Sequence, residues 1–206
     1  MFDSQIVSRW FFEPSSHAIP TDKTELVVKA PWGHVQLWRD LRYRAGPSRR
    51  SDGELLILRF LGSRGRAELA TADPGDRLES LGAEVWTVNP PGFGASTGPT
   101  SLARYAHCAL VAADAILAHA EGRPVWVYGK SIGASAALLV AAERPIDCLI
   151  VKNAVPVERL LARRHGWWNP SLLASLCIPS DLNCMHNARH SGARNSMRRR
   201  RCSSIS

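Results

Sequence analysis

Four short apolar runs recur along the chain, separated by loops or by segments long enough to form a helix. They span residues 54–60, 84–88, 125–128 and 148–151. Strands buried on both faces are almost continuously apolar, whereas half-exposed strands alternate polar and apolar residues. Strands of the first kind occur in parallel sheets covered by helices, so the sequence predicts an α/β fold.

The intervening segments supply the remaining elements. Residues 25–30 and 34–40 flank a Pro-Trp-Gly turn and predict an opening hairpin. Three helices are expected, over 66–81 with an interruption at a proline, over 102–120 with one apolar face, and over 131–143 with many small residues. This order of strands and helices predicts a three-layer domain built on a mostly parallel sheet.

The segment Gly129-Lys-Ser-Ile-Gly133 lies between an apolar run and a helix rich in small residues. A Gly-x-Ser-x-Gly spacing in this context is typical of a sharp strand-to-helix turn, where the strained serine needs neighbours without a β-carbon. The turn raises the Ser131 hydroxyl, and the start of the helix directs free N–H groups to the same place. The motif predicts a nucleophilic serine; the alternative is a glycine-rich turn with a capping serine.

Two nucleotide-binding patterns fail on spacing. The Gly-Lys-Ser triplet would end a phosphate-binding loop, but the required glycine five residues before Gly129 is Pro124. The glycines of Gly92–Gly98 are spaced one residue too far apart for a dinucleotide fingerprint, and they follow a late strand. We therefore expect no cofactor.

The net charge of +8 belongs to one end of the chain. Residues 1–181 contain 20 Lys or Arg and 18 Asp or Glu, whereas residues 182–206 contain six Arg and no acidic residue. The latter segment shows neither helical nor strand periodicity. We expect a folded domain over 1–181, with 156–181 as a candidate cap segment, followed by a disordered basic tail over 182–206. Our hypothesis is that the tail is the product of a shifted reading frame.

From cysteine usage and hydropathy we expect a cytoplasmic protein. The five cysteines are scattered and odd in number, which favours reduced thiols, and the first residues do not form a signal peptide. The longest apolar stretch, Ile132–Ala142, is far shorter than the roughly 20 residues of a membrane-spanning helix. The four Cys and His residues near the C-terminus lack the spacing of zinc ligands, so no metal site is expected: Cys177, Cys184, His186 and His190.

Three segments, taken in order, resemble the alpha/beta hydrolase family: residues 58–65, residues 89–98 and the motif at 129–133. The resemblance covers about residues 20–175. It implies that Ser131 is the nucleophile and that Gly129 and Gly133 shape its turn. It also implies an oxyanion hole built from the N–H of Ile132 and one N–H of the loop that contains these three residues: Leu61, Gly62 and Ser63. Many relatives carry histidine in place of Leu61 and aspartate in place of Asn89.

The family places its catalytic acid after the seventh strand and its histidine after the eighth, and neither strand is legible in this sequence. We therefore expect a C-terminally truncated domain. Glu158 is a weak substitute for the acid, because some relatives carry the acid after the sixth strand, where this chain has Asn153. His107 and His119 are expected on the solvated surface of the long helix. The histidines downstream of the serine fall in the expected cap or tail: His165, His186 and His190.

The sequence predicts a serine hydrolase that acts on a small-molecule carboxylic ester or related acyl substrate through Ser131. The alternative is a catalytically inactive remnant or binding protein that keeps the pocket but lacks the acid and the histidine. A third hypothesis, a basic nucleic-acid binder, is disfavoured because the arginine run has no interleaved aromatic residues. We expect no specific nucleic-acid or membrane partner, and we expect self-association through the uncovered edge of the sheet.

Overall fold

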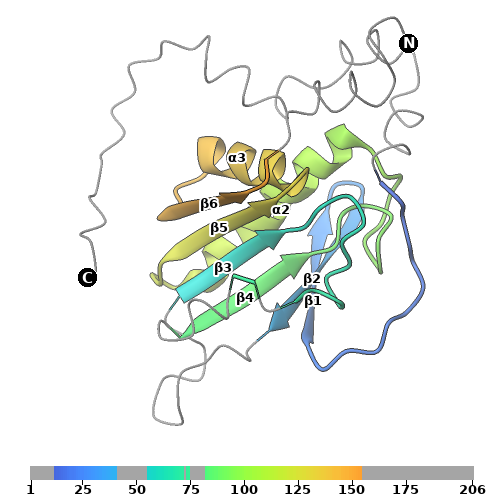
Figure 1. Ribbon diagram of the computed structural model, residues 1–206, viewed down its shortest axis with the longest axis horizontal. Helices are drawn as coiled ribbons and strands as arrows, with labels where there is room; N and C mark the ends of the chain where they lie inside the picture. Colours follow the sequence, from blue (N-terminus) through green and yellow to red (C-terminus); the bar gives the residue numbers. More distant parts are fainter. Residues whose placement is uncertain (1–11, 41–54, 72, 75–81, 155–206) are drawn as a thin grey trace, which may run out of the picture.

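The computed structural model describes residues 12–40, 55–71, 73–74 and 82–154, and these form one six-stranded sheet with two helices (Figure 1). The predicted cap segment 156–181 and basic tail 182–206 lie outside the described residues. The strands are β1 (Thr24–Ala30), β2 (Gly33–Asp40), β3 (Leu55–Phe60), β4 (Ala83–Val88), β5 (Val125–Lys130) and β6 (Cys148–Lys152), and the helices are α2 (Leu102–Ala120) and α3 (Gly133–Glu143).

The strand order in the sheet is β1-β2-β4-β3-β5-β6. The first three strands pair antiparallel, and the predicted hairpin is the pair β1 and β2. Strands β3, β4, β5 and β6 run parallel to one another. The prediction of an α/β fold with a mostly parallel sheet is confirmed. The chain passes from β3 to β4 on one side and from β5 to β6 on the other, so the loops that follow the neighbouring strands β3 and β5 diverge at one edge of the sheet, where α/β proteins bind their ligands.

The main core lies between the sheet and the two helices, which cover the same face; in Figure 1, α2 runs behind the strands. Every residue of β3 and of β4 is buried, including the polar residues Arg59, Glu84 and Thr87. A smaller apolar cluster occupies the other face: Leu55, Ile57, Ala83, Val85 and Tyr128. The described residues contain no helix on that face, so the predicted third layer is not tested.

Helix α2 has clear boundaries. The hydroxyl of Ser101 accepts a hydrogen bond from the N–H of Arg104 at 3.1 Å, which caps the first turn. The helix ends at Glu121, which has φ 49° and is followed by Gly122 with φ 85°. No helix in the described part of the chain is long and apolar enough to cross a bilayer.

The predicted helix over 66–81 is wrong in its first part. Residues 66–71 form turns, and residues 75–81 lie outside the described residues. The turns are held by the ammonium group of Lys23, which donates to the carbonyls of Ala67, Glu68 and Ala70 at 2.8–3.0 Å. A lysine more than 40 residues away therefore takes carbonyl groups that a helix would need for its own hydrogen bonds.

Leu56→Ala should lower the free energy of unfolding by about 2–5 kcal/mol, because Leu56 is fully buried in the central strand and its truncation leaves a cavity. Leu69→Ala is the matched control, because Leu69 is 65% exposed. Urea unfolding of the full chain measures both. Equal losses in the two variants would show that the core is not where the structure places it.

Candidate active site

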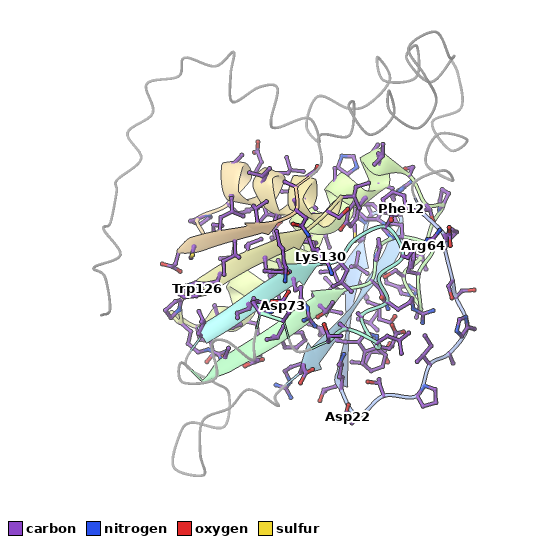
Figure 2. All side chains as sticks on the ribbon, in the orientation of Figure 1. Phe12, Asp22, Arg64, Asp73, Trp126 and Lys130 are labelled. Atoms are coloured by element: carbon purple, nitrogen blue, oxygen red, sulfur yellow. The ribbon has the colours of Figure 1, made fainter. Side chains whose placement is uncertain are left out.

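Ser131 lies at the junction of β5 and α3, as its motif predicts. Its φ is 55°, a left-handed value that costs a residue with a side chain about 1–3 kcal/mol. Two backbone hydrogen bonds hold this conformation: the Ser131 N–H donates to the carbonyl of Lys152 at 3.0 Å, and its carbonyl accepts from the N–H of Ala134 at 3.0 Å. Ser131 is half-buried, and Figure 2 labels its neighbour Lys130 beside the carboxyl ends of the central strands.

Gly129 and Gly133 occupy positions where a side chain does not fit. A methyl group on Gly129 would lie 2.7 Å from the Cα of Ala134 and 2.6 Å from the Cβ of Ala137. A methyl group on Gly133 would overlap the carbonyl oxygens of Phe60 and Leu61. The two glycines thus allow α3 to start directly against the ends of β5 and β3.

The loop after β3 lies against the serine. A methyl group on Gly62 would be 3.4 Å from the Cβ of Ser131 and 3.9 Å from its Oγ, so Gly62 and the serine side chain are neighbours. The loop is closed by a hydrogen bond from the N–H of Gly65 to the carbonyl of Gly62 at 2.9 Å. The Tyr105 hydroxyl also contacts the carbonyl of Leu61, at 3.4 Å. Leu61, Gly62 and Ser63 are thereby brought to the site that contains Ser131.

Three backbone N–H groups around the serine have no acceptor among the described residues: those of Gly62, Ser63 and Ile132. Ile132 precedes α3, and no side chain caps the start of that helix. Unpaired N–H groups at a helix start attract negative charge. This edge of the sheet can therefore stabilise an anion next to the serine hydroxyl.

The described histidines lie away from Ser131. His107 is exposed beside Trp32, as predicted. His119 was expected on the solvated surface but is half-buried, with its Nε2 3.2 Å from Oε1 of Glu84. Glu84 is at the start of β4, and β4 and β5 are parallel through β3, so this pair lies at the edge of the sheet opposite to the serine. The downstream candidates lie outside the described residues: Glu158, His165, His186 and His190.

Cys108 could in principle act as a nucleophile and Asp73 as an acid, but each interacts with other parts of the protein. Burial raises the pKa of the Cys108 thiol, so Cys108 stays protonated within the core. Asp73, labelled in Figure 2, accepts hydrogen bonds from the Tyr128 hydroxyl at 2.7 Å and from Lys152 Nζ at 2.8 Å. Asn153, which follows β6, is exposed and has φ 52°.

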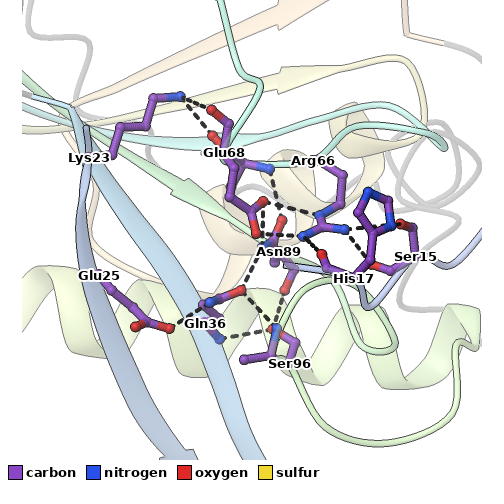
Figure 3. A network of polar contacts seen from close by, with 11 residues as sticks. Ser15, His17, Lys23, Glu25, Gln36, Arg66, Glu68, Asn89 and Ser96 are labelled. Carbon is purple, nitrogen blue, oxygen red and sulfur yellow. Dashed lines mark hydrogen bonds and ion pairs between the residues drawn. The ribbon is translucent and has the colours of Figure 1, made fainter. Parts of the chain in front are cut away.

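A buried polar network, shown in Figure 3, fixes the loops after β3 and β4. The amide of Asn89 is fully buried: its Oδ1 accepts from the N–H of Ala67 at 2.8 Å, and its Nδ2 donates to Gln36 Oε1 at 2.7 Å and Glu68 Oε2 at 3.0 Å. Glu68 in turn forms two hydrogen bonds with Arg66, at 2.6 and 3.1 Å. The sequence reasoning missed this network, because Gln36, residues 66–68 and Asn89 are separated from one another by 20 or more residues and follow no motif.

The charge of Glu68 is stabilised within this network. Burial acts to raise the pKa of Glu68, but hydrogen bonds from Arg66, from its own backbone N–H and from Asn89 outweigh it and hold the pKa below its ordinary value. The carboxylate is therefore ionised at neutral pH and strengthens the attachment of residues 66–68 to the sheet.

Comparison with known proteins gives a consistent family match. A model of the alpha/beta hydrolase fold matches residues 71–175, about half of the chain. A search of curated proteins finds no match.

Several solved structures share the fold. An alpha-beta hydrolase from Vibrio vulnificus has a TM-score of 0.61 and 14% identity, covering 83% of this chain and 60% of that one. A proposed hydrolase from Agrobacterium vitis S4 has a TM-score of 0.52 and 19% identity, with coverages of 77% and 62%. A lidless serine hydrolase from Xanthomonas campestris has a TM-score of 0.49 and 20% identity, covering 66% of this chain and 63% of that one. The chain thus spans about three-fifths of the length of these structures, and at these identities the likeness to the Vibrio vulnificus and Agrobacterium vitis structures shows the fold alone.

Asn89→Asp should lower the free energy of unfolding by about 2–4 kcal/mol at pH 7. The change removes both Nδ2 hydrogen bonds and sets a carboxylate against Gln36 Oε1 and Glu68 Oε2. Asn153→Asp is the matched control, because Asn153 is exposed. Urea unfolding measures both, and an unchanged stability of Asn89→Asp would contradict the network.

Glu68→Gln should cost about 2–4 kcal/mol at pH 7, and this loss should shrink as the pH falls below 4.5, the ordinary pKa of glutamate. A carboxyl group with a lowered pKa in the folded state contributes stability above its unfolded-state pKa and loses it as the pH falls through the folded-state value. Urea unfolding at pH 7, 4.5 and 3 measures the difference, with the exposed Glu143→Gln as control. A loss independent of pH would refute the assignment.

Proposed function

Because the chain belongs to the alpha/beta hydrolase fold family, we propose that it is a serine hydrolase acting on a carboxylic ester or related acyl substrate through Ser131. The observation that carries the proposal is the left-handed backbone of Ser131, which sets its side chain beside Gly62 and three unpaired N–H groups. A strained serine at a strand-to-helix turn is the arrangement that the nucleophile of this fold requires.

The first step is attack by Ser131 Oγ on the substrate carbonyl carbon. The new O–C bond converts the carbonyl oxygen into an oxyanion, and the tetrahedral intermediate then expels the alcohol, which leaves with the serine proton. Water attacks the resulting acyl-serine, releases the acid and returns the proton to Oγ. Each half of the reaction passes through an oxyanion at the same place.

The N–H of Ile132 and the N–H of Gly62 or Ser63 are the donors for this oxyanion. They are backbone groups, so their direction is fixed before the substrate arrives and costs no reorganisation during the reaction. Loss of one such donor in a serine hydrolase typically lowers kcat by about 10²–10³. The close fit of Gly133 against Phe60 and Leu61 keeps the two halves of the hole together.

The reaction also needs a base that takes the Ser131 proton, because a serine hydroxyl is hardly ionised at neutral pH. No described imidazole or carboxylate forms a hydrogen bond with Ser131. Under the proposal, one of the downstream histidines serves as the base: His165, His186 or His190. A site with only the serine and the oxyanion hole would still accelerate the reaction about 10³–10⁴-fold over the reaction in water.

The second candidate function is a binding protein that keeps the serine and the oxyanion hole without turnover. In that case, the hole holds a carboxylate or a carbonyl oxygen, and the serine hydroxyl is a hydrogen-bond donor rather than a nucleophile. The two candidates differ in whether Ser131 forms a covalent adduct.

Labelling with a fluorophosphonate probe separates them. The full chain should be labelled at one serine, and Ser131→Ala should abolish the signal, while Ser135→Ala, one turn further along α3, should leave it unchanged. Gel fluorescence gives the rate, and circular dichroism shows that each variant is folded. Absent labelling of a folded wild-type chain, or labelling that survives in Ser131→Ala, would rule out the hydrolase and leave the binding protein.

A further inference from the structure

A groove of about 330 Å³ lies beside the polar network, between the N-terminal segment, β1, β2 and the loops after β3 and β4. Its volume is at the lower end of the range for small-molecule sites. The charged or aromatic side chains in its walls are His17, Glu25, Trp38, Arg66 and Glu68, most of which appear in Figure 3. Ser131 and the residues of the oxyanion loop that contact it, 61–63, do not line the groove.

Arg66 is the obvious anion-binding group in the groove, but all five of its N–H donors are in use. Its Nη1 donates to the carbonyl and the hydroxyl of Ser15, at 2.6 and 3.0 Å. Its Nη2 donates to the carbonyl of His17 and to Glu68, and its Nε donates to Glu68. A guanidinium has five N–H groups and no more. The groove therefore lacks a free charged donor for an anionic ligand.

Glu68 is likewise satisfied within the protein. One of its oxygens accepts from Arg66, and the other accepts from Arg66 and Asn89. Its charge is balanced by the guanidinium, with the closest N–O distance at 2.6 Å. The Arg66–Glu68 pair thus contributes no net charge to the groove.

Glu25 is the carboxylate in the groove that the Arg66–Glu68 pair does not include. Its side chain is exposed, and its one hydrogen bond to a described residue is accepted from Gln36 Nε2. An exposed carboxylate with a single neutral donor keeps most of its acceptor positions open. Of the carboxylates that line the groove, Glu25 has no cationic partner among the described residues, so its charge is one that a bound cation can balance.

Trp38 is directly opposite Glu25 in the antiparallel pair of β1 and β2. Opposite residues in such a pair project from the same face, with β-carbons about 4.5–5.5 Å apart. The indole Nε1 of Trp38 is buried and unpaired among the described residues, so the part of the ring that reaches the groove is carbon. An aromatic ring next to a carboxylate is the pairing that recognises organic ammonium groups.

We propose that this groove binds an organic ammonium group. The cation lies at the Glu25 carboxylate, and its alkyl substituents contact Trp38 and Ile19, which also lines the groove. The ammonium group belongs either to a free amine or to the distal end of a larger ligand that reaches toward Ser131. The inference does not depend on catalysis at Ser131.

The test is an isothermal titration calorimetry experiment in which choline is added to the full chain carrying Ser131→Ala. Its neutral isostere 3,3-dimethylbutan-1-ol has the same shape without the charge and serves as the ligand control. Choline should bind saturably, and the isostere should bind at least about fivefold more weakly. Equal affinity for the two ligands, or no saturable binding of choline by the folded chain, would overturn the proposal.

Two variants locate the site. Glu25→Gln keeps the hydrogen-bonding capacity of the side chain and removes its charge, and Trp38→Leu removes the ring; each should weaken choline binding about fivefold or more. Glu143→Gln, an exposed change on α3, is the control and should have no effect. Thermal unfolding shows that the variants are folded. Unchanged binding in a folded Glu25→Gln variant would show that the groove is not the site.

A last arm identifies the source of the ammonium group, using the wild-type chain and the fluorophosphonate probe. If choline leaves the labelling rate of Ser131 unchanged while it saturates the groove, the ligand is a free amine. If choline slows the labelling in proportion to its occupancy, the groove holds the distal end of a substrate of Ser131. Both results support an ammonium site, and a chain that is not labelled at all still yields the choline titration.

Discussion

The close packing of backbone on backbone at the start of α3 is the constraint on which the rest of the site depends. The helix begins within van der Waals distance of the ends of β5 and β3, because Gly129 and Gly133 have no side chains to hold it away. In that space the chain can reverse only if Ser131 adopts its left-handed conformation. The strain of about 1–3 kcal/mol is offset by the hydrogen bonds and packing around the turn.

The buried polar network around Asn89 supports the part of the candidate oxyanion hole that the loop after β3 supplies. Gly62 is part of the loop after β3, and the segment that follows it is tied to the sheet by Asn89, Glu68, Arg66 and Lys23. The network joins the loops after β3 and β4 to the hairpin at the edge of the sheet. Gln36, Arg66 and Glu68 of this network also line the groove, so the two candidate ligand sites share a support.

The strands and the serine turn could be predicted because their signals are local. The run 54–60 is apolar at five of its seven positions, and the glycines at 129 and 133 flank the serine within five residues. The helix predicted over 66–71 is wrong because Lys23, which is distant in the sequence, binds the carbonyl groups of this segment. Such a tertiary contact leaves no trace in the local periodicity. The pairing of His119 with Glu84 depends on how α2 packs on the sheet, and the neighbourhood of Glu25 and Trp38 depends on strand register. Composition reveals neither.

The position of the oxyanion hole is the central claim, and the crystal structure of the phosphonylated protein tests it most directly. The phosphorus should be bonded to Ser131 Oγ, and the phosphoryl oxygen should lie within hydrogen-bonding distance of the N–H of Ile132 and of Gly62 or Ser63. A phosphoryl oxygen directed into solvent, with those N–H groups bonded elsewhere, would contradict the account, as would an adduct on any other side chain.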